Sequence, residues 1–287
     1  MWAAMGSDSA LARRLATAES SPLWRVGGDR LDQGGWAFLA DVTTVSGVGL
    51  VAIDRIETKV RVFAPDGTHL FTFLRPGEGP LELRSPFGVE AVPPDSVLVY
   101  SSAAAVVVPL GVNGVAGDGR RLIFPNGALD VCVSGESFFA RVSAPDQEGI
   151  VEKWSRDGVV LARFGRRVAH PDPLVASRLS MGMVECGRRA PWVVTANWDE
   201  GTLQGFTDSG DSLWTTRIAE FRGPSVSSTE ADGRPGFRVS MDEPTDLCFR
   251  SSTFWTGRCS CRWHVSVSRR KCVGGRCGRS IASIRFC

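Results

Sequence analysis

The chain has 287 residues, of which 43% are hydrophobic and 22% charged, and its formal net charge is +2. These totals indicate a soluble globular protein with a substantial core, long enough for one large β domain or two smaller ones. No run of about 20 apolar residues occurs, so a helical membrane span is not expected. Residues 1–21 hold no continuous apolar segment, and we expect a short helix or disorder there and no signal peptide.

The charge and the cysteines are unevenly distributed. Residues 248–287 carry eight Arg and one Lys but no Asp or Glu, which leaves a net charge of −7 on the preceding 247 residues. Six of the eight cysteines lie in the same C-terminal 40 residues, whereas Cys132 and Cys186 lie in the body. The body is therefore mildly acidic and poor in cysteine, and the tail differs from it in composition.

Four segments of the body share one pattern, in which an apolar strand meets a tight turn and a second strand follows. The turns are Asp-Gly, Asn-Gly or Ser-Gly pairs, which readily reach positive φ and therefore favour hairpins. Their glycines are spaced 47, 44 and 52 residues apart. The four segments are residues 60–73, 106–121, 151–165 and 203–218.

Each hairpin follows another apolar strand, and a weaker strand comes before most of these. The stronger strands are residues 49–54, 96–102, 137–143 and 191–197, and the weaker ones include 87–92 and 127–133. Four strands in each period of about 45 residues predict an all-β fold, a β-propeller of four-stranded antiparallel blades. An immunoglobulin-like sandwich is the structural rival, but it would not explain the repeated unit. The 3.6-residue periodicity of a helical solenoid is absent.

The segment from residue 50 to 86, "LVAID…KVRVFAPDGTHLFTFLRPGEGPLEL…P", resembles the blade consensus of bacterial six-bladed β-propeller proteins of the NHL-like or TolB-like kind. It departs from that pattern at Leu74, Leu81 and Leu83, and the resemblance covers roughly residues 39–218. The residues that fit are Asp54, Val62, Phe63, Asp66, Gly67, Phe73, Gly77, Glu78, Gly79, Pro80, Glu82 and Pro86.

The resemblance implies a six-bladed ring and a periplasmic or extracellular location, although the chain shows no export signal and the compartment stays open. Residues 22–247 are assigned to the propeller. The 212 residues from Trp36 to Leu247 hold four to five blades at about 45 residues a blade. We therefore expect a truncated, incomplete ring with an unpaired sheet edge.

The glycine-rich loop Gly77–Pro80 poses the question of a phosphate site. No helix is expected after it, and it lacks the Lys-Ser/Thr of a P-loop. We interpret it as a turn that carries the chain from one blade to the next.

Loops that follow the second and fourth strands of each blade are expected on one face, where propellers generally bind ligands. The long segment of residues 166–189 is assigned to this face as a loop. Its polar candidates are Arg55, Glu57, Glu78, Arg84, Asp146, Glu148, His170, Asp172, Trp198, Asp199 and Glu200. From these we select as ligand-binding residues Arg55, Glu78, Arg84, Asp146, His170, Trp198 and Asp199.

Catalytic motifs are absent: no Gly-x-Ser-x-Gly, His-Glu-x-x-His or calcium loop occurs. Of three histidines only His170 falls in an expected surface loop. No catalytic residue can be named, and we expect neither a metal nor a cofactor.

The tail, residues 248–287, has three interpretations. The first is zinc or disulfide chemistry, but its cysteines do not form the paired Cys-x₂-Cys spacing of a zinc site. Arg interleaved with Trp255 and Trp263 would suit nucleic acid. A change of reading frame near Leu247 explains best why the acids and the strand periodicity end together, and we expect no folded domain there.

The sequence therefore predicts a binding module, which recognises a small molecule, a glycan or a protein segment on the loop face around the central channel. A metal-assisted propeller hydrolase or lyase is the alternative. Nucleic-acid binding through the basic tail is the third hypothesis, and nucleic acid is not the partner we expect.

Overall fold

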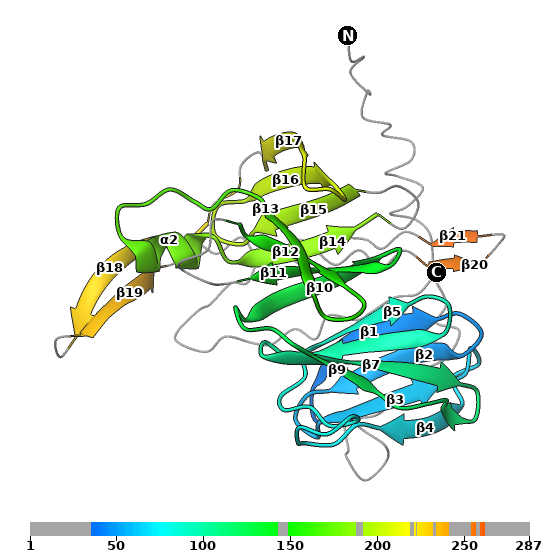
Figure 1. Ribbon diagram of the computed structural model, residues 1–287. Helices are drawn as coiled ribbons and strands as arrows, with labels where there is room; N and C mark the ends of the chain where they lie inside the picture. Colours follow the sequence, from blue (N-terminus) through cyan, green and yellow to red (C-terminus); the bar gives the residue numbers. More distant parts are fainter. Residues whose placement is uncertain are drawn as a thin grey trace, which may run out of the picture.

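The computed structural model describes residues 36–142, 149–187, 192–218, 221, 223–231, 234–240, 254–256 and 259–261. Within these residues, four antiparallel sheets form the four blades of a β-propeller (Figure 1). Blade 1 consists of β1–β4, blade 2 of β5–β9, blade 3 of β10–β13 and blade 4 of β14–β17. The strands are β1 (Leu39–Val45), β2 (Gly49–Asp54), β3 (Lys59–Phe63), β4 (His69–Phe73), β5 (Gly88–Val92), β6 (Ser96–Tyr100), β7 (Ala104–Gly111), β8 (Gly114–Val115), β9 (Arg120–Ile123), β10 (Ala128–Ser134), β11 (Ser137–Val142), β12 (Val151–Ser155), β13 (Val160–Phe164), β14 (Gly182–Cys186), β15 (Trp192–Asn197), β16 (Thr202–Thr207) and β17 (Ser212–Arg217).

The repeat predicted from the turn signals is confirmed. In each predicted hairpin the strands pair in antiparallel fashion, and the chain turns at a glycine with positive φ. The φ angles are 89° at Gly67, 145° at Gly114, 82° at Gly158 and 95° at Gly210. Blade 2 departs from the simple meander, because the short strand β8 is inserted before β9 returns to pair with β7.

Apolar side chains from alternate strand positions pack between neighbouring blades. The described residues form three such clusters, between blades 1 and 2, blades 2 and 3, and blades 3 and 4. No further cluster within these residues joins blade 4 to blade 1. The four blades thus form an arc with two ends, one at blade 1 and one at blade 4.

Each end of the arc exposes a sheet face, because blades stack face to face. On blade 4 the open face carries Trp192 and Trp214, which are 38% and 43% exposed, and Trp214 packs over Gly205. On blade 1 the ring of Trp36 covers part of the open face, 4.5 Å from the guanidinium of Arg61. Within the described residues, the two ends of the arc therefore expose sheet faces, and the unpaired edge expected from the sequence stays a prediction.

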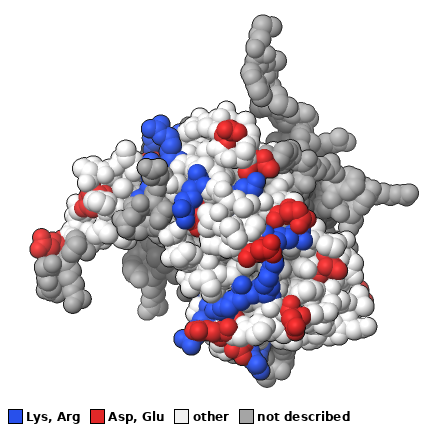
Figure 2. Space-filling view, viewed as in Figure 1, with Lys and Arg blue, Asp and Glu red and all other residues white. Residues whose placement is uncertain are grey.

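Ion pairs join the outer parts of neighbouring blades. Arg120 of blade 2 lies 2.9 Å from Asp157 of blade 3, and Lys153 of blade 3 lies 3.8 Å from Asp208 of blade 4. Figure 2 shows basic and acidic side chains interleaved on this face, without one large patch of a single sign. Exposed pairs of this kind contribute about 0–1 kcal/mol each, so the apolar clusters rather than the ion pairs hold the blades together.

The loop Gly77–Pro80 carries the chain from β4 to β5, as predicted. Its backbone N–H groups at Glu78 and Gly79 donate to Oε2 of Glu82, at 3.1 and 3.0 Å. Oε1 of Glu82 accepts from Nε of Arg75 at 2.7 Å. The loop therefore surrounds a carboxylate of its own chain in the place where a phosphate loop would hold a ligand.

The segment of residues 166–189 is not the long loop that we predicted. It contains helix α2 (Pro173–Leu179) and strand β14, the inner strand of blade 4. Oδ1 of Asp172 caps the helix by accepting from the N–H groups of Leu174 and Val175, and Pro173 occupies the first turn. We missed the helix because it is short, and the strand because Glu185 interrupts its apolar pattern.

Two hairpins follow the propeller: β18 (Ser225–Ala231) with β19 (Arg234–Ser240), and β20 (Phe254–Thr256) with β21 (Cys259–Cys261). The first packs beside α2 and projects away from the blades (Figure 1). The hypotheses on the tail concern residues that lie mostly outside the described part of the chain, and they stay predictions. In the part that is described, the seven-residue α2 is too short to cross a membrane.

The turn glycines supply a test of the blade assignment. Gly114 has space for a Cβ, but its φ of 145° strains any other residue, so we expect Gly114→Ala to lower the free energy of unfolding by about 1–3 kcal/mol. Gly117 lies in the same loop without such a φ, and a Cβ there would meet Pro109 at an ordinary 3.7 Å. Gly117→Ala should change stability by no more than about 0.5 kcal/mol. The free energy of unfolding of both variants would be measured in urea. Equal losses of stability in the two variants would contradict the assigned turn at Gly114.

Candidate functional site

A cavity of about 990 Å³ lies where the inner strands of the four blades face the propeller axis. Residues of β1, β5, β10 and β14 line its wall, and side chains of β15 and β16 extend it along the open face of blade 4. Cavities of several hundred cubic ångströms are typical of small-molecule sites. The inner strands thus determine which chemistry this cavity presents.

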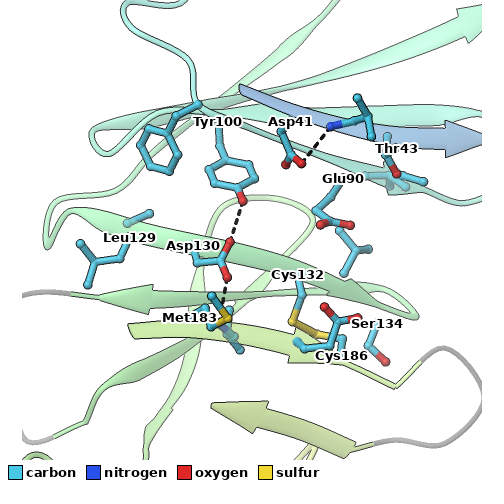
Figure 3. Close-up of a pocket in the computed structure, with 18 of the residues that line it drawn as sticks. Asp41, Thr43, Glu90, Tyr100, Leu129, Asp130, Cys132, Ser134, Met183 and Cys186 are labelled. Atoms are coloured by element: carbon cyan, nitrogen blue, oxygen red, sulfur yellow. Dashed lines mark hydrogen bonds between the residues drawn. A yellow bond between two sulfur atoms is a disulfide. The ribbon is translucent and has the colours of Figure 1, made fainter. Parts of the chain in front are cut away.

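Each inner strand contributes one carboxylic acid to the cavity. These are Asp41 of β1, Glu90 of β5, Asp130 of β10 and Glu185 of β14. Arg55 is the one basic residue of the lining, at the turn that follows β2. Figure 3 shows the side chains of Asp41, Glu90 and Asp130 directed into the same space.

Asp130 connects three blades. It lies at a bulge of β10, and its Oδ2 accepts from the backbone N–H of Val184 in blade 4 at 3.0 Å. Its Oδ1 accepts from the hydroxyl of Tyr100 in blade 2 at 2.7 Å (Figure 3). Burial raises the pKa of Asp130 to about 6, and the two donated hydrogen bonds oppose this rise.

A hydrogen bond of the same kind, from a backbone N–H to an aspartate, joins blades 1 and 2. Asp41 follows a bulge in β1, and its Oδ2 accepts from the backbone N–H of Val89 in β5 at 3.1 Å. In both cases a carboxylate of one inner strand satisfies a backbone donor of the next inner strand. Asp41 and Asp130 are therefore part of the joints between blades as well as of the cavity wall.

Arg141 lies fully buried between blades 3 and 4. Its Nη2 donates to Oδ1 of Asn197 at 2.6 Å and to the backbone carbonyl of Ser180. Among the described residues it has no ion-pair partner within salt-bridge distance, and its Nε and Nη1 have no hydrogen-bond acceptor. Burial lowers the pKa of Arg141 to about 9, against the opposing charge of Asp130, so the guanidinium stays protonated at neutral pH.

A disulfide joins the inner strands of blades 3 and 4. Cys132 of β10 and Cys186 of β14 are linked with a Cα–Cα distance of 5.6 Å, and both line the cavity (Figure 3). The other two joints between blades have no covalent link within the described residues.

Aromatic side chains surround the carboxylates at the two ends of the arc. Phe38 precedes β1, and Trp192 and Trp198 begin and follow β15. These three side chains are 38–49% exposed. The cavity therefore combines acidic groups on its wall with aromatic surface near its open side.

Two of the residues selected from the sequence, Arg55 and Trp198, line this cavity. Glu78 and Arg84 form an exposed ion pair at 3.5 Å in the loop between β4 and β5. Asp146 lies outside the described residues. As ligand-binding residues all of these remain predictions.

His170 and Asp199, the other two selected residues, lie near the two ends of α2. Nδ1 of His170 accepts from the backbone N–H of Asp172 at 3.1 Å, before the helix. Oδ2 of Asp199 lies 3.1 Å from Nε of Arg178, in the last turn of the helix. Burial raises the pKa of Asp199, and the charge of Arg178 opposes that rise. The structure does not bring these two residues together with Arg55 and Trp198 in the lining of the cavity.

Sequence reasoning missed the four acids of the wall. The available signal was an acidic residue within each weak first strand, as in "ADV" before residue 43 and "LDV" before residue 132. Such a residue interrupts the apolar alternation of its strand, so it does not stand out in the sequence as part of a site. The pairing of Cys132 with Cys186 could have been suspected because they occur in consecutive repeats, 54 residues apart.

The described residues contain no group of three or more His, Cys, Asp or Glu side chains placed to hold a metal ion. What the arrangement supplies is an acidic, partly aromatic space with hydrogen-bond acceptors. This space suits non-covalent binding of a group with positive charge.

No family model matches this chain, and no curated protein matches it either. Among solved structures it is similar to virginiamycin B lyase from Staphylococcus aureus, with 10% identity, a TM-score of 0.46, and coverage of 65% of this chain and 59% of the lyase. It is also similar to the dihydro-heme d1 dehydrogenase NirN, with 12% identity, a TM-score of 0.46, and coverage of 71% and 42%. A third is a protein of unknown function from Bacteroides thetaiotaomicron, with 11% identity, a TM-score of 0.44, and coverage of 68% and 46%.

The chain thus spans about three fifths of the lyase and less than half of the other two proteins. Similarities at this level say nothing about activity. The propeller fold of this chain follows from its own strand order and register.

The pKa of Asp130 supplies a test of the site. A carboxyl group whose folded pKa of about 6 exceeds its usual 3.8 binds its proton more tightly in the folded state. The free energy of unfolding therefore falls as pH rises between these two values, by about 3 kcal/mol at most. Asp130→Asn should remove this fall, whereas the exposed control Asp157→Asn should keep it, in urea unfolding at about pH 4 and about pH 7.

Tyr100 gives an independent measurement of the same group, because it is the chain's one tyrosine and bonds to Asp130. In protein with isotope-labelled tyrosine, its single ring signal should titrate with a midpoint of about 6. A midpoint near 3.8 would contradict the buried, three-blade position of Asp130.

Proposed function

We propose that this protein is a binding module that takes an organic cation in the cavity around the propeller axis. The proposal rests on one observation: each inner strand places a single acidic residue in the cavity wall. These residues are Asp41, Glu90, Asp130 and Glu185. A cleft with walls of one charge sign raises the local concentration of ligands of the opposite sign.

The charge balance of the cavity supports a cationic ligand. The lining contains four acidic residues and one basic residue, Arg55. The buried guanidinium of Arg141, which interacts with Asp130, offsets one further negative charge. At neutral pH Asp130 is mostly ionised, since its pKa is about 6, so the sum stays negative. Anionic ligands would meet repulsion there, and neutral ones would gain nothing from the charges.

The aromatic surface supports an organic cation over a bare ion. Phe38, Trp192 and Trp198 present exposed rings near the acids, and a cation over such a ring gains about 0.5–2 kcal/mol. Amines with an extended carbon chain would use both features. The set of partners expected from the sequence, which comprised small molecules, glycans and protein segments, thereby narrows to ligands that carry amines, including a lysine-rich segment.

The test is calorimetric titration with spermine as the cationic probe, tetraethylene glycol as a neutral probe and citrate as an anionic one. We expect spermine alone to bind. Replacing Glu90 and Glu185 together by Gln should raise its dissociation constant about tenfold or more, equivalent to about 1.4 kcal/mol. Asp157→Asn removes an acid that is 84% exposed and distant in the fold from the inner strands, and should leave the constant unchanged.

Acidification provides a second readout. Protonation of Asp130 removes a wall charge, so spermine affinity should fall as pH drops through about 6. Binding of citrate or of the glycol with equal affinity, or spermine binding that ignores the double Gln variant, would overturn the proposal.

A further inference from the structure

The joint between blades 3 and 4 has the smallest apolar cluster of the three joints within the described residues. Blade 4 is an end of the arc, and among the described residues its second face has no neighbouring blade. Its apolar cluster with blade 3 has eight buried residues, against sixteen between blades 1 and 2 and twelve between blades 2 and 3. Two of those eight are Cys132 and Cys186.

The disulfide is the covalent part of this weak joint. It connects β10 with β14 directly and closes a loop with a sequence separation of 54 residues. Polar links across the joint include the hydrogen bond from Val184 to Asp130, that from Arg141 to Asn197, and the ion pair of Lys153 with Asp208. A disulfide stabilises mainly by restricting the unfolded chain, and more so for long loops. Its loss should therefore loosen blade 4 before the others.

The disulfide also forms part of the wall of the cavity. Both cysteines belong to the lining: Cys132 is two positions after Asp130, and Cys186 directly follows Glu185. The bond therefore borders the same space as the wall charges. Both sulfur-bearing residues are nearly buried, at 3% and 4% exposure. A reductant reaches the bond through the cavity or through an opening of the joint.

We propose that Cys132–Cys186 is a redox-sensitive clasp, which holds blade 4 against blade 3 and so keeps the cavity in its binding form. The effect on ligand affinity rests on the function proposed above, whereas the effect on blade 4 does not. In the disulfide form the wall is complete, and in the dithiol form β14 is free to separate from β10.

The reaction is thiol–disulfide exchange with a dithiol reductant. A thiolate of the reductant attacks one sulfur of the bond and forms a mixed disulfide, while the other cysteine leaves as a thiolate and takes a proton from water. The second thiol of the reductant then displaces the attacked cysteine. The protein gains two thiols, and the reductant, oxidised by two electrons, becomes a disulfide. A ligand that binds the disulfide form more tightly than the dithiol form makes reduction less favourable, and by linkage the reduced protein binds that ligand more weakly.

The test is hydrogen exchange of the full-length protein before and after treatment with dithiothreitol, with the two thiols confirmed by mass spectrometry. Protection of the β15 and β16 amides should fall roughly 30- to 1,000-fold, the range for removal of such a cross-link. Protection of β2 and β3 in blade 1 should not change. Unchanged protection of blade 4 after confirmed reduction, or free thiols at Cys132 and Cys186 in protein purified under air, would overturn the clasp.

Two variants separate this bond from the other cysteines of the chain. Cys132→Ser with Cys186→Ser should show the reduced level of protection with or without dithiothreitol. If that variant does not fold, the reduced wild-type protein gives the same comparison. Replacing the six other cysteines by Ser should leave the response intact, and a response that disappears with them would overturn the assignment to Cys132–Cys186.

Spermine links the clasp to the cavity. Slower reduction in the presence of spermine, together with weaker spermine binding by the reduced protein, would support the coupling. Equal binding by both forms would overturn it. If spermine binds neither form, the proposed function fails, while the exchange experiment still decides whether the clasp holds blade 4.

Discussion

The hydrogen bonds that Asp130 accepts from blades 2 and 4 are the contacts on which the arrangement of the inner strands depends. Apolar packing between blades is non-directional, whereas a hydrogen bond specifies which atoms of neighbouring blades meet. The carboxylate of Asp130, bound by Tyr100 and by the N–H of Val184, fixes their relative height. Burial of this carboxylate is unfavourable, as its raised pKa shows, so the chain retains at this position a group that stability alone does not favour.

The same geometry connects structure with proposed function. Because inner strands must satisfy each other's backbone donors across the joints, they carry acceptors such as Asp41 and Asp130 on the surface that faces the axis. The wall of the cavity is therefore acidic for a structural reason, and a cationic ligand would use charges that are already held in place. The disulfide lies in this wall at the joint with the smallest apolar cluster.

The fold was accessible from the sequence because its signals are local. Asp-Gly and related pairs, such as Asp66-Gly67, specify a turn by the backbone freedom of glycine, and alternating strands flank them. The site was not accessible in this way. Asp41, Glu90, Asp130 and Glu185 lie far apart in the chain and meet only through the radial arrangement of the blades. Strand β14 was missed because its one charge, Glu185, points to the axis rather than marking a loop.

A double-mutant cycle on Tyr100 and Asp130 tests the central claim, that a buried carboxylate joins the blades, most directly. Stability would be measured for Tyr100→Phe, Asp130→Ala and the double variant in urea. The account predicts a coupling energy of about 1.5–3 kcal/mol, as for a hydrogen bond to a charged group. Additive effects, with a coupling below about 0.5 kcal/mol, would contradict it, because residues without a direct interaction behave in that way.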